Sequence, residues 1–395
     1  MTDIRPRDPR FPDAPILPRD TWDLPPHHRW TFQHIREMTA TAQIWRGPGP
    51  SEPWEYDLQE LGRVSFAVGG AARTVDDYLQ GSFTDAFLVI HRGRIVMERY
   101  MNGMKPHGQH LAMSVTKSVV GILAGILAGQ GTIDVAAPVT DYLPELERTA
   151  YKGARVQHLL DMTSGVLFDE SYTTPGSHMQ KLGLACGWAP HTRPDWPRTM
   201  WRLVLSLDAL EMPHGTQFRY RSIETDVLGF LLERATGRAL AELVSEELWQ
   251  PMGAEEDAYI TVDDAGAALA DGGLCATLRD YGRFARLLAE GGRRGARQVI
   301  PAEWIEATRA GNREMFRGSY RNVLPDGAYS NKFWIEDGKR RALWARGIFG
   351  QSIYVDPEAG FAVVKLSTGP EPSNDARSLE SLAAFAAIRS ALGEW

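Results

Sequence analysis

The sequence lacks several features that would place it in a specialised class of protein. It has only two cysteines, Cys186 and Cys275, far apart and outside any CxxC pattern or Cys/His cluster, which predicts free thiols and no structural zinc. Its longest apolar run, residues 119–128, is interrupted by two glycines and is too short to cross a bilayer. We therefore expect neither a zinc-stabilised domain nor a membrane partner.

Charge of one sign is also lacking. The 50 acidic and 43 basic residues are mixed along the chain and give a formal net charge of -7. Such a chain offers no broad cationic surface to a phosphate backbone, so we expect no nucleic-acid partner. Residues 1–20 contain neither the apolar core nor the small-residue cleavage site of an export signal, which predicts a cytoplasmic protein.

The motifs of several enzyme classes are missing as well. The chain has no GxSxG, no HExxH, no P-loop and no GxGxxG. Four aspartates fall on different predicted elements and show no paired pattern for a metal or for a glycosidase: Asp161, Asp226, Asp271 and Asp280. We expect no metal and no cofactor.

The chain begins with a proline-rich stretch, residues 1–55. Four tryptophans are spaced between the prolines: Trp22, Trp30, Trp45 and Trp54. Proline cannot donate a backbone hydrogen bond. This stretch is therefore predicted to be an extended arm with sparse backbone pairing, pinned to the core by its tryptophans.

Hydrophobic patterning divides the rest of the chain. Residues 56–135 and 270–395 contain β-rich runs, including a hairpin at 85–100, and are predicted to form one α/β (α+β) domain whose strands share a sheet. Residues 136–269 show helical periods and are predicted to be a mostly helical inserted domain. Helices are expected at 156–162, 200–210, 223–235, 240–249 and 378–392, and further strands at 332–336, 343–344, 351–355 and 361–366.

Ser114 and Lys117 open an apolar predicted helix that ends near Gly129. A spacing of three places the lysine amine one turn on, within reach of the serine hydroxyl. A serine nucleophile needs such a neighbour, and the helix N-terminus supplies N–H groups that suit an oxyanion. The alternative is an ordinary N-cap serine, because SxxK also arises by chance.

Two further segments contain residues suited to a cleft. Tyr220 and Ser222 form a Tyr-x-Ser pattern before a predicted helix, where a phenol and a hydroxyl can point into a cleft, although a surface tyrosine fits the pattern too. Residues 345–350 place two glycines beside a predicted strand. Glycines there permit close approach of a substrate to backbone N–H groups, or mark a β-bulge.

In their order and intervals, the three segments resemble serine hydrolases of the beta-lactamase and penicillin-binding fold, especially the class C and esterase branch. Within that branch the chain is most similar to 6-aminohexanoate-dimer hydrolases, which cleave linear nylon oligomers. The resemblance implies an antiparallel sheet flanked by helices, plus a helical domain. It is carried by residues 26–30, 113–118, 226–228, 354–357 and 364–367.

The resemblance further implies an acyl-serine hydrolase that cleaves a small amide or ester through a covalent acyl-enzyme. Ser114 would attack the carbonyl carbon, and Lys117 and Tyr220 would form the base pair. Ser222 would hold Lys117 in place. The backbone N–H groups of Ser114 and Ile348 would form the oxyanion hole.

Pocket residues follow from the same resemblance. Tyr172 would contact the scissile amide, and Trp334 would line the pocket. Phe349 stands where the nylon-oligomer enzymes carry a histidine, and Asp271 where they carry an amide. These two departures predict a pocket of different polarity.

A third departure concerns the Lys-Thr-Gly position of the fold, which reads Ala345-Arg346-Gly347. The lysine that helps to hold β-lactam carboxylates is absent, so penicillin turnover is not expected. Arg346 could grip a substrate carboxylate instead. Side chains alternate along a strand, however, and the sequence leaves open whether Arg346 faces the cleft or solvent.

Two other functions stay open at this point. One is a non-catalytic binding protein that uses Ser114 only as an N-cap. The other is a D-aminopeptidase or penicillin-binding enzyme, which the lack of an export signal disfavours because cell-wall substrates lie outside the cytoplasm. For the main hypothesis, the expected partners are a small amide or ester substrate and a second copy of the chain in a homodimer.

Overall fold

The computed structural model describes residues 19–393, so the first 18 residues of the predicted arm lie outside the described part. Its centre is a seven-stranded antiparallel sheet in the order β11-β12-β13-β14-β15-β4-β5. The predicted hairpin forms β4 and β5, and β4 also pairs with β15, so both ends of the sequence share this sheet as predicted. The strands are β4 (Thr84–His91), β5 (Arg94–Tyr100), β11 (Ala328–Ser330), β12 (Phe333–Ile335), β13 (Leu343–Gly347), β14 (Gln351–Asp356) and β15 (Phe361–Ser367).

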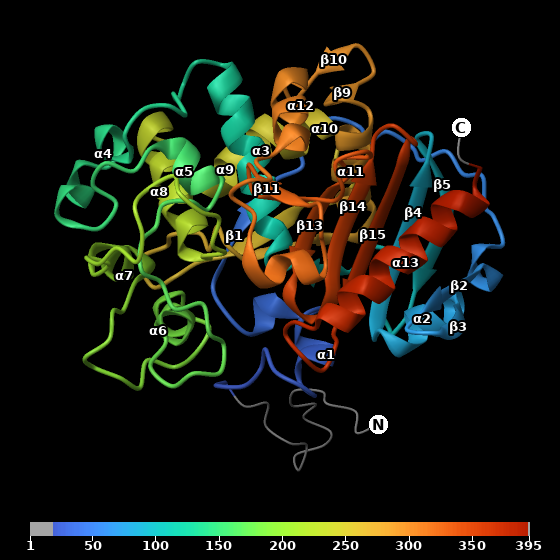
Figure 1. Ribbon diagram of the computed structural model, residues 1–395, viewed down its shortest axis with the longest axis horizontal. Coiled ribbons are helices and arrows are strands. Elements are labelled where there is room, and N and C mark those ends of the chain that lie inside the picture. Colours follow the sequence, from blue (N-terminus) through green and yellow to red (C-terminus); the bar gives the residue numbers. More distant parts are fainter. Residues whose placement is uncertain (1–18, 394–395) are drawn as a thin grey trace.

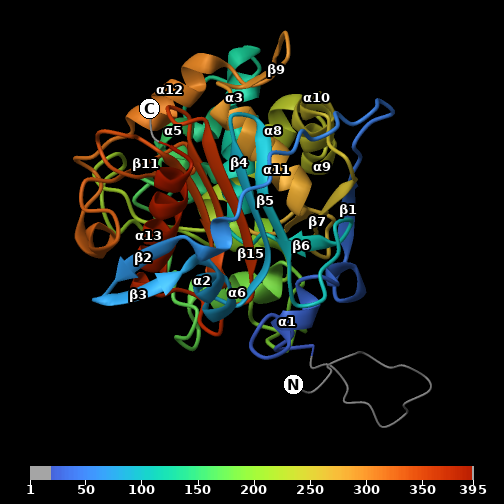
Figure 2. The ribbon, with the colours of Figure 1, turned by 90° about the vertical axis from the view of Figure 1, so that its right-hand side faces the viewer.

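Helices cover both faces of this sheet (Figure 1). Helix α13 (Asp375–Ala391) crosses one face beside α2 (Val75–Gly81), while α3 (Val115–Gly129) and α11 (Leu278–Ala289) pack on the other, as the side view shows (Figure 2). Side chains alternate along each strand, and the two sets enter two separate apolar clusters. The predicted α/β (α+β) architecture, an antiparallel sheet flanked by helices, is confirmed.

Helices dominate the segment predicted as a helical insertion, residues 136–269. Strand β7 (Ala258–Thr261) near its end pairs with β8 (Leu274–Thr277), which lies beyond the predicted boundary. The division of the chain into domains stays a prediction. The helices are α4 (Val139–Tyr142), α5 (Val156–Leu160), α6 (His178–Ala185), α7 (Met200–Leu205), α8 (Ile223–Thr236), α9 (Leu240–Val244), a π turn (Ser245–Trp249) and α10 (Gln250–Met252).

The helix predicted at 200–210 ends early, at Leu205. The carbonyl oxygens of Leu207 and Ala209 accept hydrogen bonds from the N–H groups of Ala150 and Leu167. Backbone pairing with distant segments therefore replaces the helical hydrogen bonds of residues 207–210, a tertiary effect that periodicity does not carry.

The arm is less extended than predicted. It contains a short helix, α1 (His28–Thr31), and a strand, β1 (Thr41–Ile44), that pairs along its length with β7 in a second sheet of order β1-β7-β8-β6. The expectation of sparse backbone pairing is wrong there because residues 41–44 contain no proline. Trp22 and Trp54 are buried anchors, whereas the Trp45 side chain is 49% exposed.

One further α-helix, α12 (Ala302–Ala310), places the Trp304 ring against Gly125 of α3. The remaining strands are short: β2 (Ser65–Val68), β3 (Ala71–Thr74), β6 (Gln109–Leu111), β9 (Arg293–Arg294) and β10 (Arg297–Gln298).

Helix α3 lies at the centre of the molecule, and residues 115–127 are all buried. Its two inner glycines allow neighbours to come close: a Cβ added at Gly121 would lie 2.4 Å from the carbonyl oxygen of Asn331, and one at Gly125 would lie 2.4 Å from the Trp304 ring. This packing fixes the helix and the residue at its N-terminal end, Ser114. Within residues 19–393, no helix is long and apolar enough to span a membrane.

Candidate active site

A cavity of about 380 Å³ opens at the N-terminal end of α3. Eight of the residues singled out from the sequence line it: Ser114, Tyr172, Tyr220, Trp334, Arg346, Gly347, Ile348 and Phe349. The other three are buried beside it: Lys117, Ser222 and Asp271. The fold thus gathers segments that are more than 200 positions apart in the sequence around one serine hydroxyl.

The Ser114 side chain does not cap the helix, because its hydroxyl accepts no hydrogen bond from a backbone N–H of the first turn of α3. It accepts instead from the Nζ of Lys117, at 2.8 Å. Lys117 is 1% exposed and also donates to the carbonyl oxygen of Asp271, at 2.6 Å. The predicted Ser-x-x-Lys contact is therefore present in the folded chain.

Asp271, and not Ser222 as expected, holds the Lys117 amine. The Asp271 carboxylate pairs with the Lys117 amine at 3.3 Å. Burial alone would lower the pKa of Lys117, but the nearby charge of Asp271, with smaller contributions from the other acidic groups around the amine, raises it above its ordinary value. Lys117 is consequently an ammonium at neutral pH. Asp271, expected in the substrate pocket, lies outside the cavity lining.

Ser222 is turned the other way, toward Glu170. Its hydroxyl donates to one carboxylate oxygen of Glu170 at 2.6 Å, and its backbone N–H donates to the other at 2.8 Å. The Tyr172 hydroxyl contacts the same carboxylate at 3.4 Å. Burial raises the pKa of Glu170 to about 7, although Lys117 and the Ser222 hydrogen bonds work in the opposite direction.

Glu170 was not singled out from the sequence, and no motif spacing marks it. The only available signal is its place two positions before Tyr172, which itself follows from the family resemblance alone. Glu170 and Tyr172 both line the cavity. They form a second pair of titratable groups there, separate from Lys117 and Tyr220.

A further carboxylate, Asp226, lies behind Asp271. One of its oxygens accepts the backbone N–H of Asp271 at 3.1 Å, and the other is buried without a hydrogen-bond partner. Burial and the neighbouring Asp271 charge raise its pKa well above the ordinary value. This shift favours the protonated form of Asp226. Asp271 is the carboxylate that pairs with Lys117.

Tyr220 stands between Lys117 and the aromatic wall of the cavity. The Lys117 amine lies 5.3 Å from the centre of its ring, which stacks on Trp334 at 5.7 Å. Burial raises the pKa of the Tyr220 phenol, while the Lys117 charge and an interaction with Ser114 oppose this rise. The phenol is neutral at rest but adjoins both the nucleophile candidate and a fixed cation.

The turn after β13 brings Ile348 to the same cavity. A Cβ added at Gly347 would lie 2.6 Å from the carbonyl oxygen of Ala112, so only glycine allows the strand to approach the segment that leads to Ser114. The next turn residue, Phe349, has a φ of 63°, a left-handed conformation that costs energy for a residue with a side chain.

Two sets of contacts hold Phe349 in this conformation. Its backbone N–H donates to Pro372 and its carbonyl oxygen accepts from Gly369. Its ring packs edge-on against His28 of the arm at 5.0 Å, and it is only 2% exposed. Phe349, expected to contact substrate, thus directs its ring mainly toward the arm and fixes the turn that carries Ile348.

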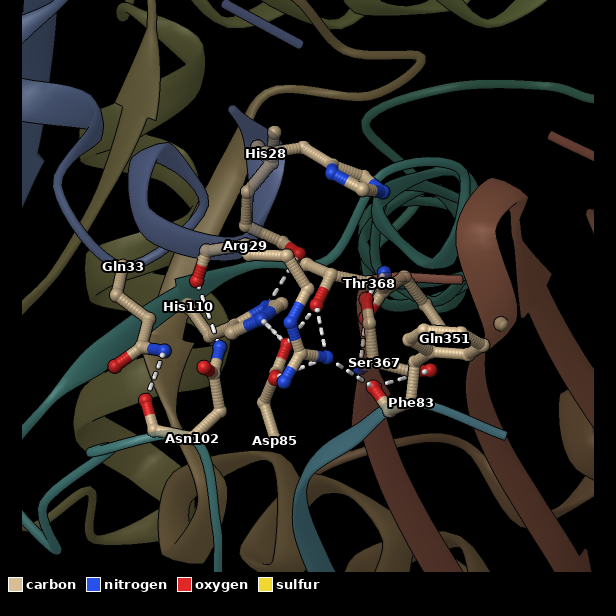
Figure 3. A network of polar contacts seen from close by, with 12 residues as sticks. His28, Arg29, Gln33, Phe83, Asp85, Asn102, His110, Gln351, Ser367 and Thr368 are labelled. Carbon is tan, nitrogen blue, oxygen red and sulfur yellow. Dashed lines mark hydrogen bonds and ion pairs between the residues drawn. The ribbon is translucent and has the colours of Figure 1, made fainter. Parts of the chain in front are cut away.

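A polar network ties the arm to the sheet behind this turn (Figure 3). The buried carboxylate of Asp85 on β4 lies 3.0 Å from His110 of β6 and 3.3 Å from Arg29 of α1. It also accepts a hydrogen bond from Thr368, at 2.8 Å. The network connects the arm to β6, which leads to Ser114, and to the end of β15.

Arg346 faces the cavity, which settles the question that strand alternation left open. Its guanidinium lies 4.3 Å from the Trp344 ring centre and 5.0 Å from that of Trp334. It donates to the hydroxyl of Ser378 at 2.6 Å. Lys365, which the sequence analysis did not select as a site residue, lines the same cavity.

Comparisons with known proteins find relatives over most of the chain. The sequence model of the beta-lactamase family matches residues 71–388. A 6-aminohexanoate-dimer hydrolase of Paenarthrobacter ureafaciens is 35% identical over 370 residues, which are 92% of this chain and 91% of that protein. The esterase EstB of Burkholderia gladioli is 31% identical over 154 residues, 38% of each chain.

A solved structure is similar over nearly the whole chain. It is a Bacillus anthracis protein with the provisional name 6-aminohexanoate-dimer hydrolase, and it superposes with a TM-score of 0.87 at 29% identity. The superposition covers 95% of this chain and 97% of the other. The resemblance drawn from the sequence motifs is confirmed.

Proposed function

The chain belongs to the beta-lactamase family of serine hydrolases, and we propose that it is a cofactor-free amidase or carboxylesterase that forms an acyl-enzyme on Ser114. The observation that carries this proposal is the Ser114 hydroxyl. It lies at the start of a buried helix, caps nothing, faces a cavity and accepts a hydrogen bond from Lys117. A hydroxyl so placed is suited to attack a carbonyl carbon.

Lys117 acts as a fixed ammonium in this scheme. An ammonium has no lone pair and cannot accept the Ser114 proton. Its hydrogen bond orients the Ser114 oxygen, and its charge stabilises negative charge that develops on that oxygen and on Tyr220. Asp271 keeps the amine at this position.

Tyr220 accepts the proton in its phenolate form, whose population grows with pH. Ser114 then bonds to the carbonyl carbon of the substrate, and Tyr220 returns the proton to the leaving nitrogen or oxygen as the bond to the leaving group breaks. In the second half-reaction the Tyr220 phenolate takes a proton from a water molecule, whose oxygen bonds to the acyl carbon. The bond from that carbon to the Ser114 oxygen then breaks, and Tyr220 returns the proton to this oxygen, which releases the acid and free Ser114.

The backbone N–H groups of Ser114 and Ile348 form the oxyanion hole of the proposal. Each oxyanion donor is typically worth about 3 to 4 kcal/mol in the transition state. The close approach at Gly347 and the fixed conformation of Phe349 support a rigid donor, because a preorganised dipole needs no reorganisation during the reaction.

Tyr172 and Glu170 are proposed to serve the leaving group. An amide leaves only when its nitrogen is protonated and correctly oriented, whereas an ester with a good leaving group departs readily. A phenol that contacts a carboxyl with a pKa of about 7 is suited to orient that nitrogen. The proposed substrates include short linear amides of the 6-aminohexanoate type as well as carboxylic esters.

The two alternative functions have less support. A binding protein with Ser114 as N-cap disagrees with the hydroxyl contacts of Ser114. A D-aminopeptidase or penicillin-binding function is disfavoured, because this chain has Ala345 at the position where the third motif carries a lysine. Cytoplasmic location and a homodimer stay predictions, to be checked by cell fractionation and by light scattering after gel filtration.

Rapid mixing with a p-nitrophenyl ester tests the proposal. If deacylation limits the rate, the wild-type protein is expected to release a burst of p-nitrophenol equal to the enzyme concentration, followed by slower turnover. If acylation limits the rate, it is expected to release p-nitrophenol at a steady rate that depends on Ser114. Ser114→Ala is expected to show neither. Turnover by Ser114→Ala at the wild-type rate contradicts the proposal.

A further inference from the structure

The N-terminal arm packs around the two segments that carry the proposed oxyanion donors. Its buried side chains share one apolar cluster with Met113, the residue before Ser114. The same cluster contains Phe349, the residue after Ile348. From the arm it contains Trp22, Phe32, Ile35 and Met38. A single apolar cluster therefore joins the arm to both donor segments.

Both neighbours of the donors have a backbone conformation that needs support. The φ of Met113 is 50° and that of Phe349 is 63°, in the left-handed region that costs energy for a residue with a side chain. Such a residue keeps its conformation only where the surrounding contacts fix it. The arm supplies contacts of this kind, because the Phe349 ring lies 5.0 Å from the His28 ring and 5.7 Å from the Phe32 ring.

Phe32 also fixes the segment that leads to Ser114. Its carbonyl oxygen accepts the backbone N–H of Leu111 at 2.8 Å, at the end of β6. Its buried ring lies 5.9 Å from the ring of His110, the residue before Leu111. Leu111 is three positions before Ser114. Phe32 thus contacts both donor segments.

A chain of hydrogen bonds connects His28 of the arm with the turn of Ile348. The buried His28 Nε2 lies 2.7 Å from the carbonyl oxygen of Gly369. Because a carbonyl oxygen only accepts, Nε2 carries the proton in this contact. Gly369 in turn donates its N–H to the carbonyl oxygen of Phe349 at 2.9 Å. The arm therefore holds the turn through the segment that follows β15.

Arg29 fixes the same segment from a second direction (Figure 3). Its guanidinium donates to the hydroxyl of Thr368 at 3.0 Å and to the carbonyl oxygen of Phe83 at 3.2 Å. The Thr368 N–H donates to the same carbonyl oxygen at 3.0 Å. His28 and Arg29 are consecutive, so one turn of the arm holds both Thr368 and Gly369.

We infer that the arm is a clamp for the oxyanion hole, with His28 and Phe32 as positioning residues for its two N–H donors. Neither residue lines the cavity, so both act through the donor segments and not on a substrate. A donor is effective only if its N–H is fixed where the negative charge will develop. A misplacement of about 1 Å can cost up to about 10²-fold in rate. The inference rests on the proposed function, which assigns the two donors.

Single-turnover stopped flow with a p-nitrophenyl ester and excess enzyme tests the clamp. His28→Leu removes the hydrogen bond to Gly369, and Phe32→Leu removes the ring contacts. Each is expected to lower the acylation rate constant about tenfold, less than the roughly 10²- to 10³-fold cost of deleting a donor. The half-saturating concentration is expected to stay within about twofold, because the donors act mainly on the transition state. Unchanged acylation in both variants overturns the inference.

Inhibition by phenylboronate gives a second readout. Boronates form a tetrahedral adduct with a serine hydroxyl, and this adduct resembles the transition state. Both variants are expected to bind phenylboronate about tenfold more weakly than the wild-type protein does. Wild-type inhibition in both variants counts against the clamp.

Two further variants separate positioning from general destabilisation. His28→Gln supplies an amide N–H at the reach of Nε2 and is expected to recover most of the acylation rate that His28→Leu loses. Ile44→Ala is the matched control for lost arm packing, since Ile44 is fully buried but belongs to the main core cluster. It is expected to lower the melting temperature and to leave acylation unchanged. An acylation loss in Ile44→Ala as large as that in Phe32→Leu overturns the inference.

Hydrogen exchange measures positioning without turnover. Circular dichroism first verifies that each variant folds, and Phe32→Leu carries the test if His28→Leu does not fold. Peptides that cover residues 110–116 and 346–352 are expected to exchange about tenfold faster in the two leucine variants, and at the wild-type rate in Ile44→Ala. Wild-type exchange of both peptides in the leucine variants overturns the clamp. Faster exchange in a protein whose wild-type form cleaves no ester would instead contradict the proposed function and leave the clamp standing.

Discussion

Two groups of buried charges lie on either side of Ser114, and they are built differently. The near group consists of Lys117 with the acids Asp271, Asp226 and Glu170. The far group consists of Arg346 and Lys365, which have no acid in contact. Both groups belong to one site, yet only the near group is balanced by the protein itself.

The difference shows what each group is suited to do. A lysine that is paired and hydrogen-bonded within the protein keeps its charge and position whether or not a ligand is present, which suits a group that supports proton transfer. Cations without a protein partner gain most when a ligand supplies the anion. The near group is therefore suited to support the proposed reaction, and the far group, which lines the same cavity, is suited to contact a substrate.

The largest expected effect is the loss of Lys117. Lys117→Arg keeps the charge but replaces a compact ammonium by a planar fork that does not fit between Ser114 and Asp271. We expect kcat/KM for esters to fall by about 10³-fold, within the range for lost acid–base groups. Neutral and charged esters should lose activity alike. Activity near wild type would remove Lys117 from the mechanism.

The second prediction concerns Tyr220 and pH. Because burial holds the pKa of this phenol above its ordinary value of 10, the phenolate population and kcat/KM are expected to rise with pH through the neutral and mildly alkaline range. Tyr220→Phe should lower kcat/KM by about 10²-fold and abolish the Tyr220-dependent part of that rise. Stopped-flow acylation between pH 6 and 10 measures both. A variant with the full wild-type profile would assign the base role to another group.

Tyr172 should have a smaller and more selective effect. Tyr172→Phe removes the phenol that contacts Glu170, and we expect amide turnover to fall about tenfold more than ester turnover. The measurement compares a p-nitroanilide with the p-nitrophenyl ester of the same acid. Equal losses for both substrates would reduce Tyr172 to a packing role.

The smallest effect is on stability, through Glu170. Its pKa is about 7 in the folded protein against 4.5 ordinarily, so the folded state binds the proton more tightly, and wild-type stability is lost as pH rises from about 4.5 to about 7. The stability that the wild type loses in this way amounts to about 3 kcal/mol at most. Glu170→Gln has no titratable group at this position and does not show this loss. Its melting temperature relative to wild type is expected to rise between pH 4 and pH 8.

Glu224→Gln is the matched control for Glu170. Burial raises the pKa of Glu224 to about 7 too, but this residue lies outside the cavity lining and accepts a hydrogen bond from Ser164. It should share the pH-dependent change in melting temperature without changing the amide-to-ester ratio. A constant melting difference for Glu170→Gln across this pH range would contradict the raised pKa.

Local spacing predicted the near group in part. Ser114 and Lys117 are one helical turn apart, so the sequence alone brings them together, and the contact is present. Asp271 lies 154 positions from Lys117, and no periodicity relates the two. The family resemblance implies this role for Ser222 instead, which lies near Tyr220 in sequence but contacts Glu170 in the fold.

Prediction of the far group from the sequence would have required the register of the strands. Arg346 was recognised as a candidate, but its face could not be predicted, because shifting a strand by one residue reverses every side chain. The pairing of Ser352 with both Arg346 and Lys365 resolves the face and adds Lys365, which the sequence places only on a predicted strand. The sheet itself was predictable, since its apolar runs are local features.

Mass spectrometry of the acyl-enzyme tests the central claim most directly. The protein is mixed with a fluorophosphonate, or with an ester and quenched in acid, and the modified peptide is sequenced. The account predicts one adduct per chain, on Ser114, and none in Ser114→Ala. Turnover by the wild-type protein together with an adduct on another residue, or a fully labelled Ser114→Ala, would contradict it.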